Sequence, residues 1–427
     1  MPHTGRQHAA SERPRTQPTE RAPDGAAVDL ETQVAPFAEL LARPVEAQRA
    51  TGYYHTLREI GQQPDTWRRT AAGMLQRRDV LKRFLEGACP EGSRRPVLVT
   101  GSGSSYYGAE CLSWSLQDAL SRPVLAVSGG QLLTDGLRHL PVGRPTLMMS
   151  LGRSGNSPES SAAIDLLLER EPTCRHLIIT CNRQGHVAQR YHDDPRVLAV
   201  VLDDETCDRS LVMTSSLTNM LVAARFVGLL DARDAYTALV RDLTASATRL
   251  LVQQADALAR VARHGFRSAV FLGSGPGYGA AREAALKLLE MTAGDIPTMA
   301  ETYLALRHGP MSAVRESTVM VCFLSSDPVA RAYETDLIRE VNGKALPLFK
   351  VVVGQQVPDD IILDQDLVID VPGDRASSGD NLPVLDILVG QLLAFFCSLH
   401  RGFAPDRPST NGAIARVVAA FDIHQHG

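Results

Sequence analysis

A glycine-rich pattern occurs twice in this chain and constrains its fold more than any other feature. The segment PVLVTGSGSSYYGAE begins at Pro96, and the segment SAVFLGSGPGYGAAREAA begins at Ser268. Both contain an apolar run, then Gly-Ser-Gly, then a turn of small residues that leads into a helical pattern, so that Gly101 corresponds to Gly273. The two copies lie much further apart than the repeats of a solenoid. The pattern therefore predicts one type of α/β domain that is present twice.

Around each copy, short apolar runs alternate with helical patterns, which is typical of parallel strands joined by crossover helices. A chain of 427 residues is long enough for two such domains. We expect the first domain, with a preceding helix, over residues 51–240 and the second, with a C-terminal tail, over residues 241–427. The expected strands are 96–100, 124–128, 146–151, 176–180, 197–202, 269–273, 319–324, 347–353 and 367–372. The expected helices are 65–86, 158–171, 215–230, 232–263, 279–292 and 329–342.

The N-terminal segment is polar and rich in proline and has no apolar core, so we expect a disordered leader over residues 1–50 rather than a signal peptide. The most apolar late run, residues 387–399, contains Gln391 and is too short to span a bilayer. The seven cysteines are scattered and show no CxxC spacing, which is typical of a reducing compartment. We therefore expect a cytoplasmic protein without a membrane partner.

Charge and motif content exclude several classes of protein. The formal net charge of −4 and the lack of a basic block argue against nucleic acid, but a local pocket can still bind an anionic small molecule. The turn at Gly101 lacks the third glycine of GxGxxG, although the turn at Gly273 comes close, and no Walker lysine follows either turn. A dinucleotide is therefore the weaker interpretation. His424 and His426 lack a third ligand, and no HExxH or paired-cysteine set occurs, so we expect neither a metal nor a cofactor.

Three loops of the first half each follow an apolar run and precede a helical pattern. In open parallel sheets such loops meet at the carboxyl ends of the strands, where ligands bind. Accessible backbone N–H groups and a helix N-terminus attract an anion, so the loops predict a phosphate site. Turns and helix caps use the same residues, and that interpretation stays open for each loop alone. The candidate side chains are Ser104 and Ser105 in the first loop, Arg153, Ser154 and Ser157 in the second, and Thr218 in the third.

The second half carries the candidate reactive groups. Glu283, Lys287 and Glu290 are separated by four and three positions and therefore share one face of a helix. A solvated Glu–Lys pair on the surface is the alternative interpretation of this spacing. His308 is followed by Gly-Pro, which indicates that a turn holds it. A glutamate and a histidine are a suitable pair to enolise a sugar, because one moves the proton between carbons while the other serves the ring oxygen.

These residues resemble the sugar isomerase (SIS) domain family, and specifically its members with two SIS domains. Within that group, the chain is most similar to the tagatose-6-phosphate ketose/aldose isomerases, also described as galactosamine-6-phosphate deaminases. The resemblance extends from Leu57 to the C-terminus. Its motifs are EIGQQPDTW from Glu59, GSGSSYYGAE, SLGRSGNSPES, the Glu290 helix, Arg307-His-Gly-Pro and the ending RPSTNGAIARVV.

The resemblance implies a flavodoxin-like sandwich for each domain, in which helices cover both faces of a parallel sheet. It also implies a homodimer whose active sites share residues across subunits, and phosphate binding at Ser104, Ser105, Arg153, Ser154 and Ser157.

The isomerase half of glutamine–fructose-6-phosphate aminotransferase is a further relative. That likeness places Glu290 where the proton moves between carbons 1 and 2, and His308 where the sugar ring opens; Lys287 is expected to contact substrate. This chain shows only a leader where that family has its glutaminase domain, so glutamine is not the expected nitrogen source. No lysine follows Lys350, and Arg416 lies nearest the place of the family's tail lysine. Arginine does not readily form a Schiff base, so Arg416 is expected to bind substrate instead.

The predicted function is conversion of galactosamine 6-phosphate to tagatose 6-phosphate and ammonia, by ring opening and proton transfer. One alternative is an aldose–ketose isomerase that acts without deamination, because it needs the same residues. Another is a non-catalytic sugar-phosphate sensor, although the chain has no basic helix-turn-helix pattern and retains both Glu290 and His308.

Overall fold

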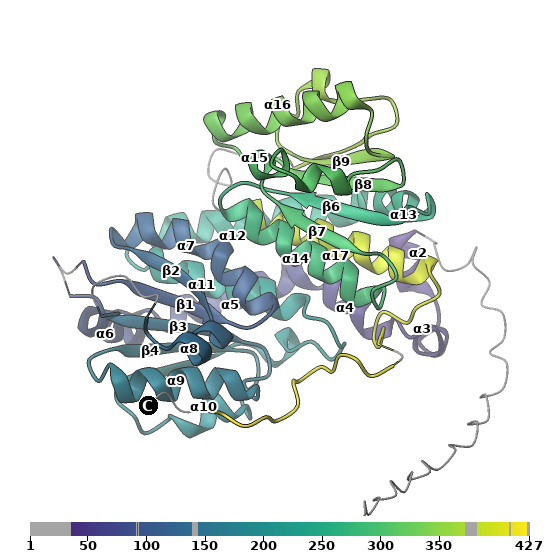
Figure 1. Cartoon of the computed structure of the whole chain (residues 1–427). Coiled ribbons are helices and arrows are strands. Elements are labelled where there is room, and N and C mark those ends of the chain that lie inside the picture. Colours follow the sequence, from purple (N-terminus) through teal and green to yellow (C-terminus); the bar gives the residue numbers. More distant parts are fainter. Residues whose placement is uncertain are drawn as a thin grey trace, which may run out of the picture.

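Two five-stranded parallel sheets, one in each half of the chain, form the framework of the protein (Figure 1). The computed structural model describes residues 36–90, 92, 94–138, 144–371, 382–409 and 411–424. The first sheet has the order β2 (Val124–Ser128), β1 (Val97–Gly101), β3 (Leu147–Gly152), β4 (Arg175–Thr180), β5 (Val197–Val201). The second has the order β10 (Leu367–Asp370), β9 (Phe349–Gly354), β8 (Thr318–Phe323), β6 (Ser268–Leu272), β7 (Thr298–Glu301). Both sheets have the flavodoxin-like order 2-1-3-4-5 within their domain, which confirms the predicted fold class.

Helices cover both faces of each sheet. Those that precede or belong to the first domain are α2 (Phe37–Ala42), α3 (Val45–Thr51), α4 (Tyr54–Gly61), α5 (Gln63–Gln76), α6 (Arg78–Ala88), α7 (Ser104–Leu120), α8 (Gly129–Asp135), α9 (Pro158–Arg170), α10 (His186–Arg190) and α11 (Ser215–Gly228). Those that link the domains or belong to the second are α12 (Arg233–Gln253), α13 (Ala255–Arg263), α14 (Pro276–Met291), α15 (Tyr303–Leu306), α16 (Pro328–Lys344) and α17 (Leu382–His400).

Alternate residues of each strand enter different hydrophobic cores. Val97 and Val99 of β1 face the core that contains α7, α11, α14 and α17, whereas Leu98 faces a separate core under α9. In the second sheet, Phe271 of β6 joins the first of these cores and Val270 faces a third core under α16. The inner faces of the two sheets therefore share one continuous apolar interior, which joins the domains.

α17 lies in the middle of this shared interior. Among the described helices, only its segment Pro383–His400 is long and apolar enough to cross a membrane, and 94% of that segment is buried within the protein. It packs most extensively on α14, and it also contacts α12 and α13. This burial identifies α17 as a core helix of the second domain.

The structure corrects several predicted boundaries. α2 and all but the last residue of α3 lie within residues 36–50, which were expected to be part of a disordered leader; residues 1–35 lie outside the described part. The expected helix 65–86 is two helices that meet at Arg77, and the expected linker helix 232–263 is divided near Gln254. β7 was missed because its four residues, TMAE, are only half-buried and form the edge of the sheet.

The duplication extends to backbone conformation. Gly103 precedes α7 with φ 55° and ψ −126°, and Gly275 precedes α14 with φ 53° and ψ −127°. Positive φ at both places favours glycine, which explains why the pattern recurs in the sequence. In each sheet, the first strand lies between the second and the third: β1 lies between β2 and β3, and β6 lies between β7 and β8. The strand order reverses there, so a ligand crevice is expected between β1 and β3 and between β6 and β8.

Close approach of α14 and α17 generates a prediction about stability. A Cβ atom at Gly390 would lie 2.9 Å from the Cα of Ala284, so we expect Gly390→Val to destabilise the fold by about 1–3 kcal/mol through overpacking. Thermal unfolding should show a lower midpoint. Gly343→Ala on α16 is the control, because no atom lies within 4 Å of its Cβ position and removal of a helical glycine stabilises by up to about 1 kcal/mol. Equal midpoints for the two variants would contradict this packing.

Candidate active site

Buried polar atoms without partners mark the crevice between β1 and β3. Thr100 and Ser150 are paired in register at the ends of these strands, and the hydroxyl of each is buried without a hydrogen-bond partner among the described residues. Oε2 of Glu159, in the first turn of α9, is also buried and unpaired there. Such groups are rare in proteins and usually indicate a functional role or a missing partner. The crevice therefore has the character of a binding site.

The two predicted serine loops border this crevice. Ser104 and Ser105 form the first turn of α7 and are only 5% and 4% exposed. Ser154 is buried as well, and its hydroxyl accepts a hydrogen bond from the Asn156 N–H at 3.2 Å. Ser157 is the N-cap of α9, yet its side chain makes no capping hydrogen bond. The structure thus places these serines at two helix N-termini that follow neighbouring strands, as an anion site requires.

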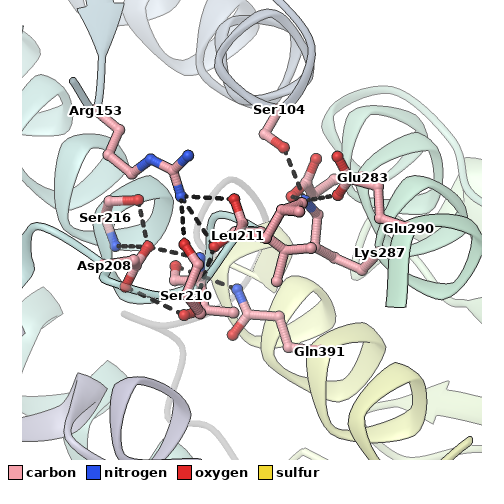
Figure 2. Close-up of polar contacts among 12 residues, drawn as sticks. Ser104, Arg153, Asp208, Ser210, Leu211, Ser216, Glu283, Lys287, Glu290 and Gln391 are labelled. Carbon is pink, nitrogen blue, oxygen red and sulfur yellow. Dashed lines mark hydrogen bonds and ion pairs between the residues drawn. The ribbon is translucent and has the colours of Figure 1, made fainter. Parts of the chain in front are cut away.

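α14 brings three charged side chains to the same region (Figure 2). The Lys287 ammonium donates to the Ser104 hydroxyl at 3.0 Å, forms an ion pair with Glu290, and lies 3.5 Å from Oε1 of Glu283. The side chains of Lys287 and Glu283 are 1% and 0% exposed, whereas that of Glu290 is 23% exposed. The predicted common helix face is therefore present, but it faces the interior, and the alternative of a solvated surface pair is wrong.

Burial controls the protonation of this triad. Burial raises the pKa of Glu283 to about 7; Lys287 opposes this shift and the negative charge of Glu290 adds to it. Burial alone lowers the pKa of Lys287, but the two carboxylates outweigh that effect and the pKa is raised. One ammonium is thus held between two carboxyl groups, and the partly exposed Glu290 is able to accept or donate a proton.

Arg153 forms contacts that sequence reasoning did not predict. The residue is 6% exposed, and its guanidinium donates to the carbonyls of Leu211 and Val212, both at 3.0 Å, and to that of Arg416 at 2.7 Å. These hydrogen bonds hold the loop before α11 and the C-terminal tail. The guanidinium was expected to line the serine loops, and these donors do not. Arg153 nevertheless contributes positive charge near Lys287, whose pKa it lowers.

Two buried carboxylates that sequence reasoning missed organise the same loop. Asp208 accepts hydrogen bonds from the backbone N–H groups of Thr214 at 2.7 Å and Ser216 at 3.0 Å (Figure 2). Glu59 accepts from the N–H of Ser210 at 3.2 Å, and burial, reinforced by Asp208, raises the pKa of Glu59 to about 8. In the sequence, Glu59 stood only as the first residue of the EIGQQPDTW motif, and Asp208 only as an aspartate shortly before a loop rich in hydroxyl groups.

Thr218 corrects one further expectation, and Arg416 forms a contact within the chain that sequence reasoning did not predict. Thr218 is fully buried; its hydroxyl donates to Oε1 of Gln63 at 2.7 Å and accepts from Nε1 of Trp67 at 3.0 Å. It therefore joins α11 to α5 and does not face a ligand. Arg416 lies in the tail, which returns to the first domain (Figure 1), and its Nε donates to the Asp208 carbonyl at 3.0 Å.

His308 is exposed in the loop after α15, and its backbone N–H donates to the Ala305 carbonyl at 2.9 Å. Within the described part of the chain, its imidazole forms no hydrogen bond or ion pair, including with Glu290. A single chain therefore does not bring the two predicted catalytic residues into contact. The described residues contain no group of three His, Cys, Asp or Glu side chains able to hold a metal, and His426 lies outside them.

Comparison with known proteins identifies the family. No family model matches the chain. A Streptomyces coelicolor protein named AgaS is 36% identical over 380 residues, which cover 87% of this chain and 95% of that protein. The D-galactosamine-6-phosphate deaminase AgaS of Escherichia coli is 33% identical over 379 residues, which cover 88% of this chain and 97% of that protein.

A solved structure shows the same relationship. The tagatose-6-phosphate ketose/aldose isomerase from Escherichia coli superposes with a TM-score of 0.77 at 30% identity, over 87% of this chain and 96% of that one. Identities of this size over nearly the whole length of the relatives, together with two flavodoxin-like domains, show that the chain belongs to the SIS (sugar isomerase) family, within the branch of the AgaS proteins.

Proposed function

We propose that the protein is an amino-sugar phosphate deaminase/isomerase that converts galactosamine 6-phosphate and water to tagatose 6-phosphate and ammonia. The observation that carries this proposal is the contact between Lys287 and Ser104, which joins a proton-transfer group to a phosphate loop. The AgaS relatives support the choice of substrate, because the Escherichia coli protein is named for this deamination.

The reaction begins with ring opening, to which His308 contributes by proton transfer at the ring oxygen. Glu290 then removes the proton from carbon 2 of the open aldehyde, which gives an enolamine, and returns a proton to carbon 1. The product is a ketose imine. Water adds to this imine, ammonia leaves, and the ketose 6-phosphate remains. Each proton taken by Glu290 is given back, so the carboxylate is regenerated.

The surrounding residues hold the substrate. Ser104, Ser105, Ser154 and Ser157, together with the N-termini of α7 and α9, bind the phosphate. Lys287 supplies a fixed positive charge beside them and orients Glu290. Arg153 and Arg416 act as positioning residues, because their donors bind backbone carbonyls that join the tail to the site.

We further propose that the enzyme is a cytoplasmic homodimer in which each active site receives His308 from the partner subunit. The support is the position of His308, which is exposed and unpaired within the described chain, whereas a ring-opening group must contact the substrate. The phosphosugar is then the only expected partner besides the second subunit, without nucleic acid or membrane.

An aldose–ketose isomerase without deamination is the second candidate. It is favoured by the name of the Escherichia coli structure, a tagatose-6-phosphate ketose/aldose isomerase. Both reactions need ring opening and proton transfer between carbons 1 and 2, so the two differ only in the group on carbon 2.

Ammonia release distinguishes the candidates. Purified protein is incubated with galactosamine 6-phosphate, glucosamine 6-phosphate or galactose 6-phosphate, and ammonia and ketose phosphate are measured in parallel. We expect equal amounts of ammonia and tagatose 6-phosphate from the galacto substrate. Ketose formed only from galactose 6-phosphate, without ammonia from either amino sugar, would establish the simple isomerase. Thermal stabilisation by phosphosugars without any turnover would establish a sensor.

Removal of the proposed base tests the mechanism. Glu290→Gln should lower kcat by about 10²–10⁴-fold, because the amide does not accept the carbon-bound proton, while substrate affinity is largely retained. Steady-state kinetics and calorimetric binding of galactosamine 6-phosphate measure the two effects. Asp118→Asn is the matched control, since Asp118 is exposed on α7 at the position that corresponds to Glu290 in the duplicated domain. Full activity of Glu290→Gln would remove Glu290 from the mechanism.

The raised pKa of Glu283 predicts a pH-dependent effect on stability. Its carboxyl is protonated in both folded and unfolded chains below pH 4.5, and it must ionise at a cost in the folded state as the pH rises to about 7. The wild type therefore loses stability across this window, whereas Glu283→Gln does not. The difference in unfolding midpoint, variant minus wild type, should increase between about pH 4.5 and about pH 7. Glu86→Gln, an exposed change on α6, controls for the loss of one glutamate, and a constant difference for Glu283→Gln would contradict the prediction.

A further inference from the structure

The second domain contains a cavity of about 220 Å³ at the carboxyl ends of β6 and β8. Its walls include Ser274 and Gly275 from the loop after β6, and Ser326 from the loop after β8. Trp114 of α7 and Asp386 of α17 complete it. The cavity is separate from the residues proposed to bind the phosphosugar, and it lies where the strand order of the second sheet reverses.

Internal duplication relates this cavity to the active site. α7 and α14 pack against each other, with Ser104 at one end of the pair near Lys287 and Gly275 at the other end near Trp114. The cavity therefore uses the N-terminus of α14 and the later turns of α7, whereas the active site uses the N-terminus of α7 and the later turns of α14. Ser115 occupies the position on α7 that corresponds to Lys287, and the Lys–Glu pair is missing. The cavity has the geometry of a binding site but not the proton-transfer groups.

An unpaired carboxyl group faces this cavity. Asp386 is 5% exposed and forms no hydrogen bond or ion pair with the described residues. Behind the wall, Glu334 is fully buried; its Oε2 accepts from the Ser325 N–H at 2.8 Å, while its Oε1 has no partner there. Burial, with a contribution from Glu334, raises the pKa of Asp386 well above its ordinary value. A cation in the cavity would satisfy this carboxyl group.

No lysine, arginine or histidine is among the described residues that line the cavity. The guanidinium of Arg331, next in sequence to the lining residue Ala330, is engaged: its Nε donates to the Ser325 carbonyl at 2.5 Å and its Nη1 to the Gln355 carbonyl at 2.7 Å. A phosphate would therefore meet acidic groups without a positive partner. The charge pattern is opposite to that of the active site, where Lys287 and Arg153 supply positive charge.

Size and shape restrict the ligand further. The cavity is smaller than the roughly 300–1,000 Å³ that hold drug-sized molecules, so it suits a single sugar ring. Trp114 is 60% exposed at the cavity, and a Cβ atom at Gly275 would lie 2.9 Å from its indole ring. An indole face binds both the C–H face of a sugar and a nearby ammonium group. Ser274 and Ser326, which carry hydroxyl groups, also line the cavity.

We propose that this cavity is a second binding site, which takes an unphosphorylated amino sugar in its protonated form. The ammonium group pairs with Asp386, the ring packs on Trp114, and the sugar hydroxyls bond to the two loops. This site does not depend on the proposed deaminase activity, because it uses none of the residues assigned to catalysis.

Calorimetric titration with galactosamine tests the site. The wild type should bind galactosamine with a Kd in about the millimolar range, and Asp386→Asn and Trp114→Ala should each weaken binding at least about tenfold. Galactose, which lacks the amine, should also bind at least about tenfold more weakly. In the Glu290→Gln variant, which is expected to turn over slowly but still to bind substrate, saturating galactosamine 6-phosphate in the active site should leave galactosamine binding unchanged.

Three results would overturn the proposal: no binding of galactosamine, equal binding by both cavity variants and the wild type, or loss of galactosamine binding when galactosamine 6-phosphate is present. The last result would place the amine in the active site. Trp114→Ala changes an exposed side chain and is expected to fold. The proposal can therefore still be tested if Asp386→Asn does not fold. Unfolding midpoints show which variants are folded.

Discussion

The contact between α7 and α14 is the interaction on which the active site depends. These helices belong to different domains, yet a Cβ atom at Gly279 would lie 2.9 Å from both Cys111 N and the Tyr107 carbonyl, so their backbones approach closely. This approach brings the buried ammonium of Lys287 to the hydroxyl of Ser104. The proposed phosphate loop belongs to one domain and the proposed proton-transfer group to the other, and their shared hydrophobic interior fixes the two together.

The buried charges at this contact are better explained by a role in catalysis than by a contribution to the stability of the fold. A buried ion pair costs desolvation energy, and a hydrophobic replacement of similar volume is often as stable or more so. Lys287 has two carboxyl groups and one hydroxyl around it, which keeps the ammonium charged in the interior. The desolvation energy is least compensated at Glu283, because its oxygens have no hydrogen-bond partner of good geometry among the described residues. Perturbed carboxyls of this kind concentrate in active sites.

Local patterns predicted the framework, and distant contacts determined the rest. The strands were found because buried parallel strands are apolar runs, and Gly101 and Gly273 revealed the duplication. The helix face of Glu290 followed from spacing alone. The partners of Arg153 could not be predicted, because Arg416 lies in a distant tail, and a hydroxyl in a core network, such as that of Thr218, has the same local sequence signature as one in a ligand loop.

The duplicated fold shows how one scaffold supports two crevices of opposite charge. Gly103 and Gly275 have the same backbone conformation, and the side chains around them differ. Where the first domain presents Ser104 beside Lys287, the second presents Pro276 beside Trp114. Pro276 removes a backbone donor from the helix N-terminus, and the described lining has the Asp386 carboxyl but no basic side chain, so the second crevice is unsuited to an anion although its geometry is retained. The shared fold therefore does not determine which ligand each crevice prefers. The side chains around each glycine loop determine that preference.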